Sequence, residues 1–97
     1  MVKRNKITSV YIIDEDPIAL KLMADLLKKN GCSVTTSTDS SQVINDIIRK
    51  TPDFVIAEMM MPKVDGLSLC KKVLKHKKLR KTKFIIVSAK VYEYDLK

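Results

Sequence analysis

Three short apolar segments, separated by stretches of helical periodicity, constrain the fold of this 97-residue chain more than any other feature. They run from Ile7 to Ile13, from Phe54 to Ala57 and from Phe84 to Val87, and a polar residue follows each one. The last two are apolar throughout rather than alternating, which is typical of strands that are covered on both faces. The segments therefore predict buried strands of an α/β sheet.

Stretches with helical spacing lie between these strands. From Pro17 to Asn30, apolar residues recur at i, i+3, i+4 and i+7, with Asp16 as the expected N-cap and Gly31 just past the end. A second helix is predicted from Ser40 to Lys50, and a third begins near Gly66. The second helix is expected to bury Val43, Ile44, Ile47 and Ile48. The apolar residues of the third are Leu67, Cys70, Val73 and Leu74. A weaker strand is indicated by the alternation of Cys32, Val34 and Thr36.

The alternation of strand and helix predicts a doubly wound parallel sheet, because right-handed crossovers connect parallel strands. A length of 97 residues suits one domain, residues 1–97, and 45% hydrophobic with 31% charged residues argues against disorder. The tail from Lys90 to Lys97 is expected to begin a fourth helix. Ligands of such sheets bind where the strands end, which is where functional residues are to be sought.

Composition also limits the cellular context. No apolar run approaches the ~20 residues that a membrane span requires, so no membrane partner is expected. The basic N-terminus precedes an apolar stretch that stops at Asp14 and lacks a small-residue cleavage site, so a cytoplasmic location is expected. Cys32 and Cys70 have no metal-binding or disulfide spacing.

Acidic residues follow two of the predicted strands. Asp14, Glu15 and Asp16 come after the first and Glu58 after the third, while Ser88 follows the last. Asp16 is expected to cap its helix, and Asp14, Glu15 and Glu58 to converge in one acidic pocket at the carboxyl ends of the strands. Clustered carboxylates suit a hard cation such as Mg²⁺. The alternative is that these residues are solvated loop acids.

Four segments share a recognisable order and spacing: IIDEDP at 12–17, PDFVIAE at 52–58, MPKVDG at 61–66 and VSAK at 87–90. Together they make the whole chain resemble the receiver domains of two-component response regulators, which act in phosphorelay signal transduction. The resemblance implies a flavodoxin-like fold with strand order 2-1-3-4, and a signalling module rather than an enzyme. It also implies protein partners, namely a histidine kinase or an output domain.

The resemblance assigns a role to each residue of the acidic edge. Asp14 and Glu15 would hold Mg²⁺, with the Met60 backbone carbonyl and Glu58 as further ligands. Ser88 would be the switch hydroxyl that contacts phosphoryl oxygens. Glu58 stands where the family has its phosphate-accepting aspartate.

Glu58 is the first departure from the family pattern. Its carboxylate lies one methylene, about 1.5 Å, farther from the backbone than that of an aspartate. Since phosphoryl transfer depends mostly on positioning, ordinary phosphorylation is not expected, which would make this a pseudo-receiver. The longer carboxylate either imitates the activated state or fills an inert site.

The second departure is that the chain stops at Lys97, before the family's fifth strand. Phe84 to Val87 would then form an apolar edge strand, which is a template for pairing with another chain. We therefore expect a partner or a second copy of the chain to complete this edge, as in a dimer.

Two other functions compete with the signalling module. Asp14-Glu15-Asp16 and Ser88 also resemble motifs of the Mg²⁺-dependent haloacid-dehalogenase-type phosphohydrolases, although Pro17 and Ile18 replace the residues expected next. The other alternative is a basic adaptor for an anionic partner, since eight of the thirteen residues from 71 to 83 are Lys or Arg. Nucleic acid is not expected as that partner, because no aromatic residues interleave the run.

Overall fold

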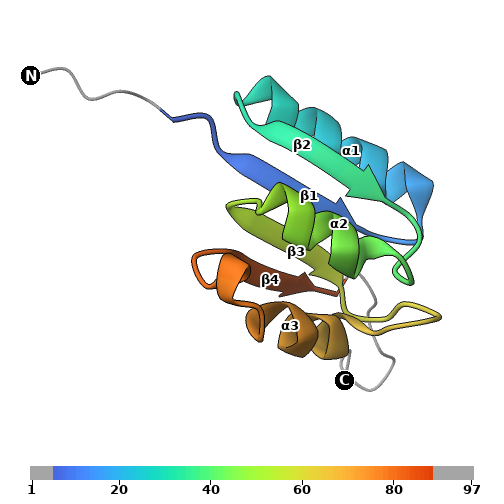
Figure 1. Ribbon diagram of the computed structural model, residues 1–97. Coiled ribbons are helices and arrows are strands. Elements are labelled where there is room, and N and C mark those ends of the chain that lie inside the picture. The colour runs from blue at the N-terminus through green and yellow to red at the C-terminus, as the bar shows by residue number, and fades with distance from the viewer. Residues whose placement is uncertain (1–5, 89–97) are drawn as a thin grey trace, which may run out of the picture.

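The computed structural model describes residues 6–88 of the chain. Strands and helices alternate along the chain, as the sequence predicted, and a short 3₁₀ helix precedes the last strand (Figure 1). In order, the elements are β1 (Ser9–Ile13), α1 (Pro17–Lys29), β2 (Ser33–Ser37), α2 (Val43–Lys50), β3 (Phe54–Glu58), α3 (Gly66–Leu74), η1 (Lys77–Leu79) and β4 (Lys83–Val87).

All four strands pair in parallel in the order β2-β1-β3-β4, which confirms the predicted topology. Figure 1 shows α2 and α3 on one face of the sheet and α1 on the other. The side chains of β1 alternate between the two faces of the sheet, and helices cover both faces, so β1 is buried on both sides. Tyr11 and Ile13 pack into the core beneath α2 and α3, whereas Val10 and Ile12 pack against α1. The central strand is therefore fixed from both sides.

The predicted capping of α1 is confirmed, whereas α2 begins later than expected. The Asp16 carboxylate accepts a hydrogen bond from the Ile18 N–H at 3.0 Å, which starts α1. The second helix was expected from Ser40, but α2 begins at Val43. The preceding residues form a turn instead, because Asp39 accepts hydrogen bonds from both the backbone N–H and the hydroxyl of Ser41.

The apolar stripe predicted for α3 is partly wrong. Leu69 and Val73 are completely buried, whereas Leu67 and Leu74 are 47% and 53% exposed. The Asp65 carboxylate caps the helix by accepting from the Ser68 N–H at 2.7 Å, and this cap sets the phase in which Leu69 and Val73 face the sheet. Leu67 and Leu74 therefore fall on a flank of the helix.

Within the described residues, β4 lies at an edge of the sheet, with β3 as its strand neighbour. Ile85, in the middle of β4, is 42% exposed. This agrees with the predicted apolar edge at Phe84 to Val87. The helix predicted to begin in the tail, Lys90 to Lys97, lies outside the described residues.

Gly66 marks the closest approach between α3 and the end of β3. A Cβ atom at this position would lie 2.7 Å from the Glu58 carbonyl oxygen and 3.2 Å from the Met59 Cα, both of which are backbone atoms. We therefore expect Gly66→Ala to lower the free energy of unfolding by about 1–3 kcal/mol, measured by urea denaturation. Lys71→Ala, at an exposed position of the same helix, should change it by less than about 0.5 kcal/mol. Equal stability of the two variants would contradict the close approach.

Asp53 ties the start of β1 to the start of β3. Its carboxylate accepts hydrogen bonds from the Ser9 N–H at 2.8 Å and from the Lys6 ammonium at 3.3 Å. The Ser9 N–H, assisted by Lys6, holds the pKa of the Asp53 carboxyl below its usual range. A lowered pKa in the folded state means that the stabilisation is complete above the unfolded pKa, near 4, and is lost as the pH falls further.

We accordingly expect Asp53→Asn to destabilise the protein by about 1 kcal/mol at neutral pH. The difference from the parent should shrink as the pH falls below about 4, and it should vanish once Asp53 is protonated in the folded state as well. Urea denaturation at several pH values measures this. A difference that stays constant with pH would attribute the loss to packing rather than to charge.

Candidate functional site

Asp14 and Glu58 lie side by side at the carboxyl ends of the two central strands. The register pairs Ile13 of β1 with Ala57 of β3, so the next residue of each strand is one of these acids. Asp14 is 8% exposed and Glu58 is 5% exposed. The sheet thus buries two carboxyl groups at the edge where the sequence predicted an acidic pocket.

Backbone N–H groups hold both carboxyl groups in place. Asp14 Oδ1 accepts a hydrogen bond from the Asp16 N–H at 2.9 Å, which turns the chain from β1 into α1. Glu58 Oε2 accepts from the Met60 N–H at 3.4 Å, so this side chain lies over the loop that follows its own strand. Burial is tolerated because these polar groups have partners.

Glu15 does not join the other two carboxylates as predicted. It is exposed and lines a hollow with loop residues at the same edge: Met60, Met61, Pro62 and Asp65. Within residues 6–88, no group of three or more His, Cys, Asp and Glu side chains could hold a metal ion. Asp14, Glu15 and Glu58 therefore do not form the group of three carboxylates that was expected, since Glu15 is exposed whereas Asp14 and Glu58 are buried.

Ser88 emerges beside Glu58. Val87, the last residue of β4, pairs with Glu58, and its carbonyl oxygen accepts a hydrogen bond from the Met59 N–H at 2.7 Å. Ser88 follows directly and is exposed. A hydroxyl therefore lies at the same edge of the sheet as the two buried carboxyl groups.

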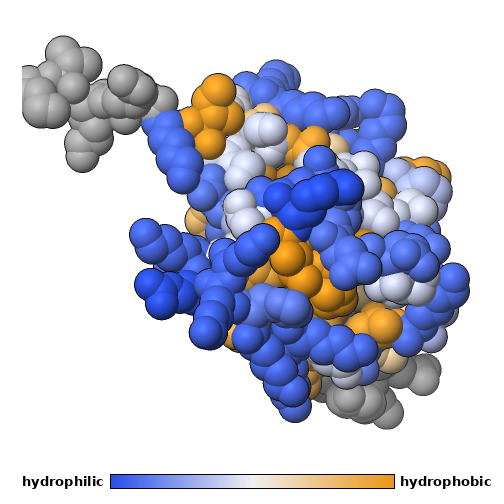
Figure 2. Space-filling model, in the orientation of Figure 1, coloured by the Kyte–Doolittle hydropathy of each residue, from blue (hydrophilic) through white to orange (hydrophobic). Residues whose placement is uncertain are grey.

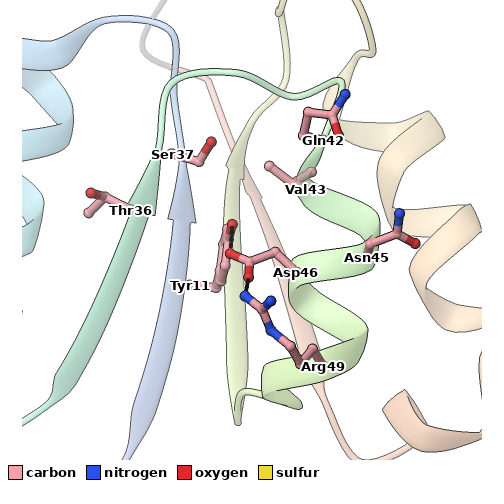
Figure 3. A pocket seen from close by; sticks show the side chains of 8 residues that line it. All are labelled: Tyr11, Thr36, Ser37, Gln42, Val43, Asn45, Asp46 and Arg49. Atoms are coloured by element: carbon pink, nitrogen blue, oxygen red, sulfur yellow. Dashed lines mark hydrogen bonds and ion pairs between the residues drawn. The ribbon is translucent and has the colours of Figure 1, made fainter.

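A second polar hollow, of about 510 Å³, lies between the α2 face of the sheet and α2 itself. Figure 3 shows Tyr11 of β1 pointing toward Asp46 of α2, which in turn meets Arg49. The Tyr11 hydroxyl donates to Asp46 Oδ2 at 2.6 Å. Other polar side chains line the rest of the hollow: Thr36, Ser37, Gln42 and Asn45.

This cluster was not predicted from the sequence, although the i, i+3 spacing of Asp46 and Arg49 on an amphipathic helix signals an ion pair. Burial, together with the hydrogen bond to Asp46, raises the pKa of the Tyr11 hydroxyl far above its ordinary value. The same hydrogen bond lowers the pKa of Asp46. Phenol, carboxylate and guanidinium satisfy one another here, so the cluster connects β1 to α2 rather than presenting a reactive group.

No helix among the described residues is both long and apolar enough to cross a lipid bilayer.

Comparisons with known proteins agree with the fold and the edge described above. The chain is 30% identical over 86 residues to the protein PilG of Pseudomonas aeruginosa, covering 89% of this chain and 64% of that one. It is 24% identical over 86 residues to the alkaline phosphatase synthesis transcriptional regulatory protein PhoP of Bacillus subtilis, covering 89% and 35% respectively. The chain thus spans less than two thirds of the length of either relative.

Among solved structures, the receiver domain of the sensor histidine kinase PA1611 of Pseudomonas aeruginosa superposes with a TM-score of 0.80 at 19% identity. The match covers 94% of this chain and 75% of that domain, whose structure has a magnesium ion coordinated in the active-site cleft. At this identity the likeness shows the fold alone. The sequence itself decides the family, because residues 10–97 match the response regulator receiver domain family, and the chain therefore belongs to that family.

Proposed function

We propose that this chain is an atypical receiver domain that signals through protein contacts and is not phosphorylated in the ordinary way. The observation that carries the proposal is the identity of the buried carboxylate at the end of β3, which is Glu58 rather than an aspartate. The family's phosphate acceptor is expected at this strand end. Phosphoryl transfer requires the attacking oxygen, the phosphorus and the leaving group to lie roughly in line, so a displaced carboxylate is a poor acceptor.

The contacts of Glu58 support this proposal. Its carboxylate reaches the Met60 N–H, so the longer side chain folds over the loop after its strand. A negative charge then lies near the place where phosphoryl oxygens would be bound. Two outcomes follow from this placement. Either the carboxylate imitates the phosphorylated state and holds the loop in the activated arrangement, or it fills an inert site.

We include Mg²⁺ binding at the same edge in the proposal. Mg²⁺ is usually bound through one or two carboxylates and keeps several water ligands, so three convergent acids are not required. Asp14 and Glu58, buried in register, offer carboxylate oxygens, and Glu15 and the Met60 carbonyl lie at the same edge. This all-oxygen donor set fits Mg²⁺. A bound ion would offset the negative charge of the edge.

Ser88 completes the proposed site. It follows Val87, which pairs with Glu58, and this neighbourhood supports a role for its hydroxyl at the carboxylate edge. We assign it the role of the switch hydroxyl. In this role its hydroxyl would contact the negatively charged group at position 58, which is the carboxylate of Glu58 or, in a variant, the phosphoryl group of a phosphorylated aspartate.

The proposed partners are proteins. A histidine kinase or an output domain would contact the acidic edge and its loops. We also expect a second copy of the chain to pair with β4 along Phe84 to Val87, because β4 is an edge strand of the described residues and its apolar Ile85 is 42% exposed. The cytoplasmic location expected from the sequence stays a prediction.

The decisive experiment for the acceptor position uses a small phosphodonor. We expect no phosphate on the parent protein after incubation with acetyl phosphate and Mg²⁺, measured as intact mass. Glu58→Asp should gain the mass of one phosphoryl group, because the shorter carboxylate restores the attacking geometry.

Two controls make this result interpretable. Glu58→Asp combined with Asp14→Asn should lose the modification, since it lacks the proposed metal ligand, and urea denaturation should show that both variants fold. Phosphate on Glu58 of the parent would overturn the proposal. A folded Glu58→Asp variant that stays unmodified would favour an inert site over a switch.

A titration tests the metal site independently of phosphorylation. Adding Mg²⁺ to the parent should shift the amide resonances of Glu15 and Met60, which belong to the proposed ligand set. Asp14→Asn should weaken the apparent affinity by about tenfold or more, since a charged oxygen ligand becomes a neutral one. Asp25→Asn removes the same charge from the exposed Lys21 ion pair of α1 and should leave the titration unchanged. Identical titrations of the two variants would exclude Asp14 as a ligand.

A further inference from the structure

The segment from α3 to β4 carries a concentration of positive charge that lies outside the proposed receiver site. Residues 66–88 contain no acidic residue. Eight Lys and Arg side chains of this segment are exposed, and we refer to them as the basic surface. They are Lys71, Lys72, Lys75, Lys77, Lys78, Arg80, Lys81 and Lys83.

The basic surface is not neutralised by the fold. The ion pairs among residues 6–88 involve Lys6, Lys21, Arg49 and Lys63, and no member of the basic surface. The dipole of α3 favours Lys71 and Lys72 in its last turn, but this effect falls off within one turn. The basic residues from Lys77 onward therefore have no structural counterpart within the described part of the chain.

The backbone beneath these charges is anchored rather than loose. Leu79 of η1 is completely buried in the core. Thr82 is buried as well, and its hydroxyl donates to the Pro52 carbonyl oxygen at 2.6 Å. The Lys83 N–H donates to the Asp53 carbonyl oxygen at 2.9 Å. Since the backbone is already ordered, a partner would mainly have to immobilise side chains on binding.

The basic surface and the acidic site lie at opposite ends of the strands: the basic surface at the amino ends and the acidic site at the carboxyl ends. Figure 1 shows η1 and the start of β4 at the amino ends of the strands, whereas the arrowheads of β1 and β3 mark the edge that carries Asp14 and Glu58. Figure 2, in the same orientation, shows mostly hydrophilic residues on the side where η1 lies. A ligand of one edge would leave the other edge accessible.

We propose that the basic surface binds an acidic protein segment that also carries apolar side chains. Seven of the eight cations are lysines, which act as point charges and lack the fork with which arginine grips phosphate in two places. No Phe, Tyr or Trp lies between Gly66 and Lys83, so His76 is the one aromatic ring there that could stack on bases. Leu74, which is 53% exposed in the last turn of α3, offers an apolar contact among the lysines. Carboxylates with an interspersed leucine match this combination of charge and apolar surface.

Fluorescence anisotropy with a labelled synthetic peptide of glutamates and leucines tests the proposal. Lys77→Gln with Lys78→Gln should weaken binding by about fivefold or more. The control variant Lys28→Gln with Lys29→Gln removes the same charge from two exposed lysines that neighbour each other in α1, outside the basic surface. It should weaken binding by less than about twofold. Replacing the peptide's glutamates by glutamines should abolish binding. Equal weakening by both double variants would reduce the effect to net charge and overturn the proposal.

Two further measurements identify the class of partner. Leu74→Ser should weaken binding of the leucine-containing peptide and leave that of polyglutamate unchanged, because only the former makes the apolar contact. A DNA duplex and phosphatidylserine vesicles serve as competitors, and tighter binding of either would overturn the choice of an acidic protein segment. Glu58→Asp should bind the peptide like the parent, so failure of the proposed receiver switch would not affect this result.

Discussion

The parallel register between β1 and β3 is the constraint on which the rest of the structure depends. It sets Ile13 beside Ala57 and therefore Asp14 beside Glu58, so two acidic side chains are buried next to each other. Burying a carboxylate is costly unless hydrogen bonds compensate it. The backbone N–H groups of the two following loops supply such bonds. The loops that border the site are thus shaped by the same side chains that form it.

Under the proposed function, one carbon atom matters at position 58. In a site that works by positioning, the chain folds first and the side chain must then reach a fixed point in space. Glu58 meets the burial and hydrogen-bonding requirements of the strand end. It therefore preserves the fold of a receiver domain while changing where the charge lies. For this reason, membership of the receiver family is compatible with the proposed loss of ordinary phosphorylation at position 58.

The topology and the place of Asp14 and Glu58 at the ends of β1 and β3 could be predicted from the sequence, because they follow from patterns within single segments. The roles of the site residues stay predictions. Apolar runs identified β3 and β4, and Asp16 with Pro17 fixed the start of α1. Features that depend on contacts between segments were less accessible. The helical phase of α3 was mispredicted. Leu67 and Leu74, which are exposed, fit a helical stripe as well as the buried Leu69 does, so the spacing alone does not show which leucines face the sheet. The exposure of Glu15 and the contact of Tyr11 with Asp46 depend on how separate segments pack, which the sequence pattern does not encode.

The close approach of Gly66 to the Glu58 carbonyl has a structural consequence. The Gly66 N–H also donates to the Met59 carbonyl oxygen at 2.9 Å. The backbone of the first turn of α3 therefore contacts the backbone at the end of β3 directly, with no side chain between them. A helix of nine residues is about 13 Å long, so α3 spans much of the length of the neighbouring strands. One short helix thus connects the acidic edge to the basic surface, with its first turn fixed against the end of β3 and Lys71 and Lys72 in its last turn.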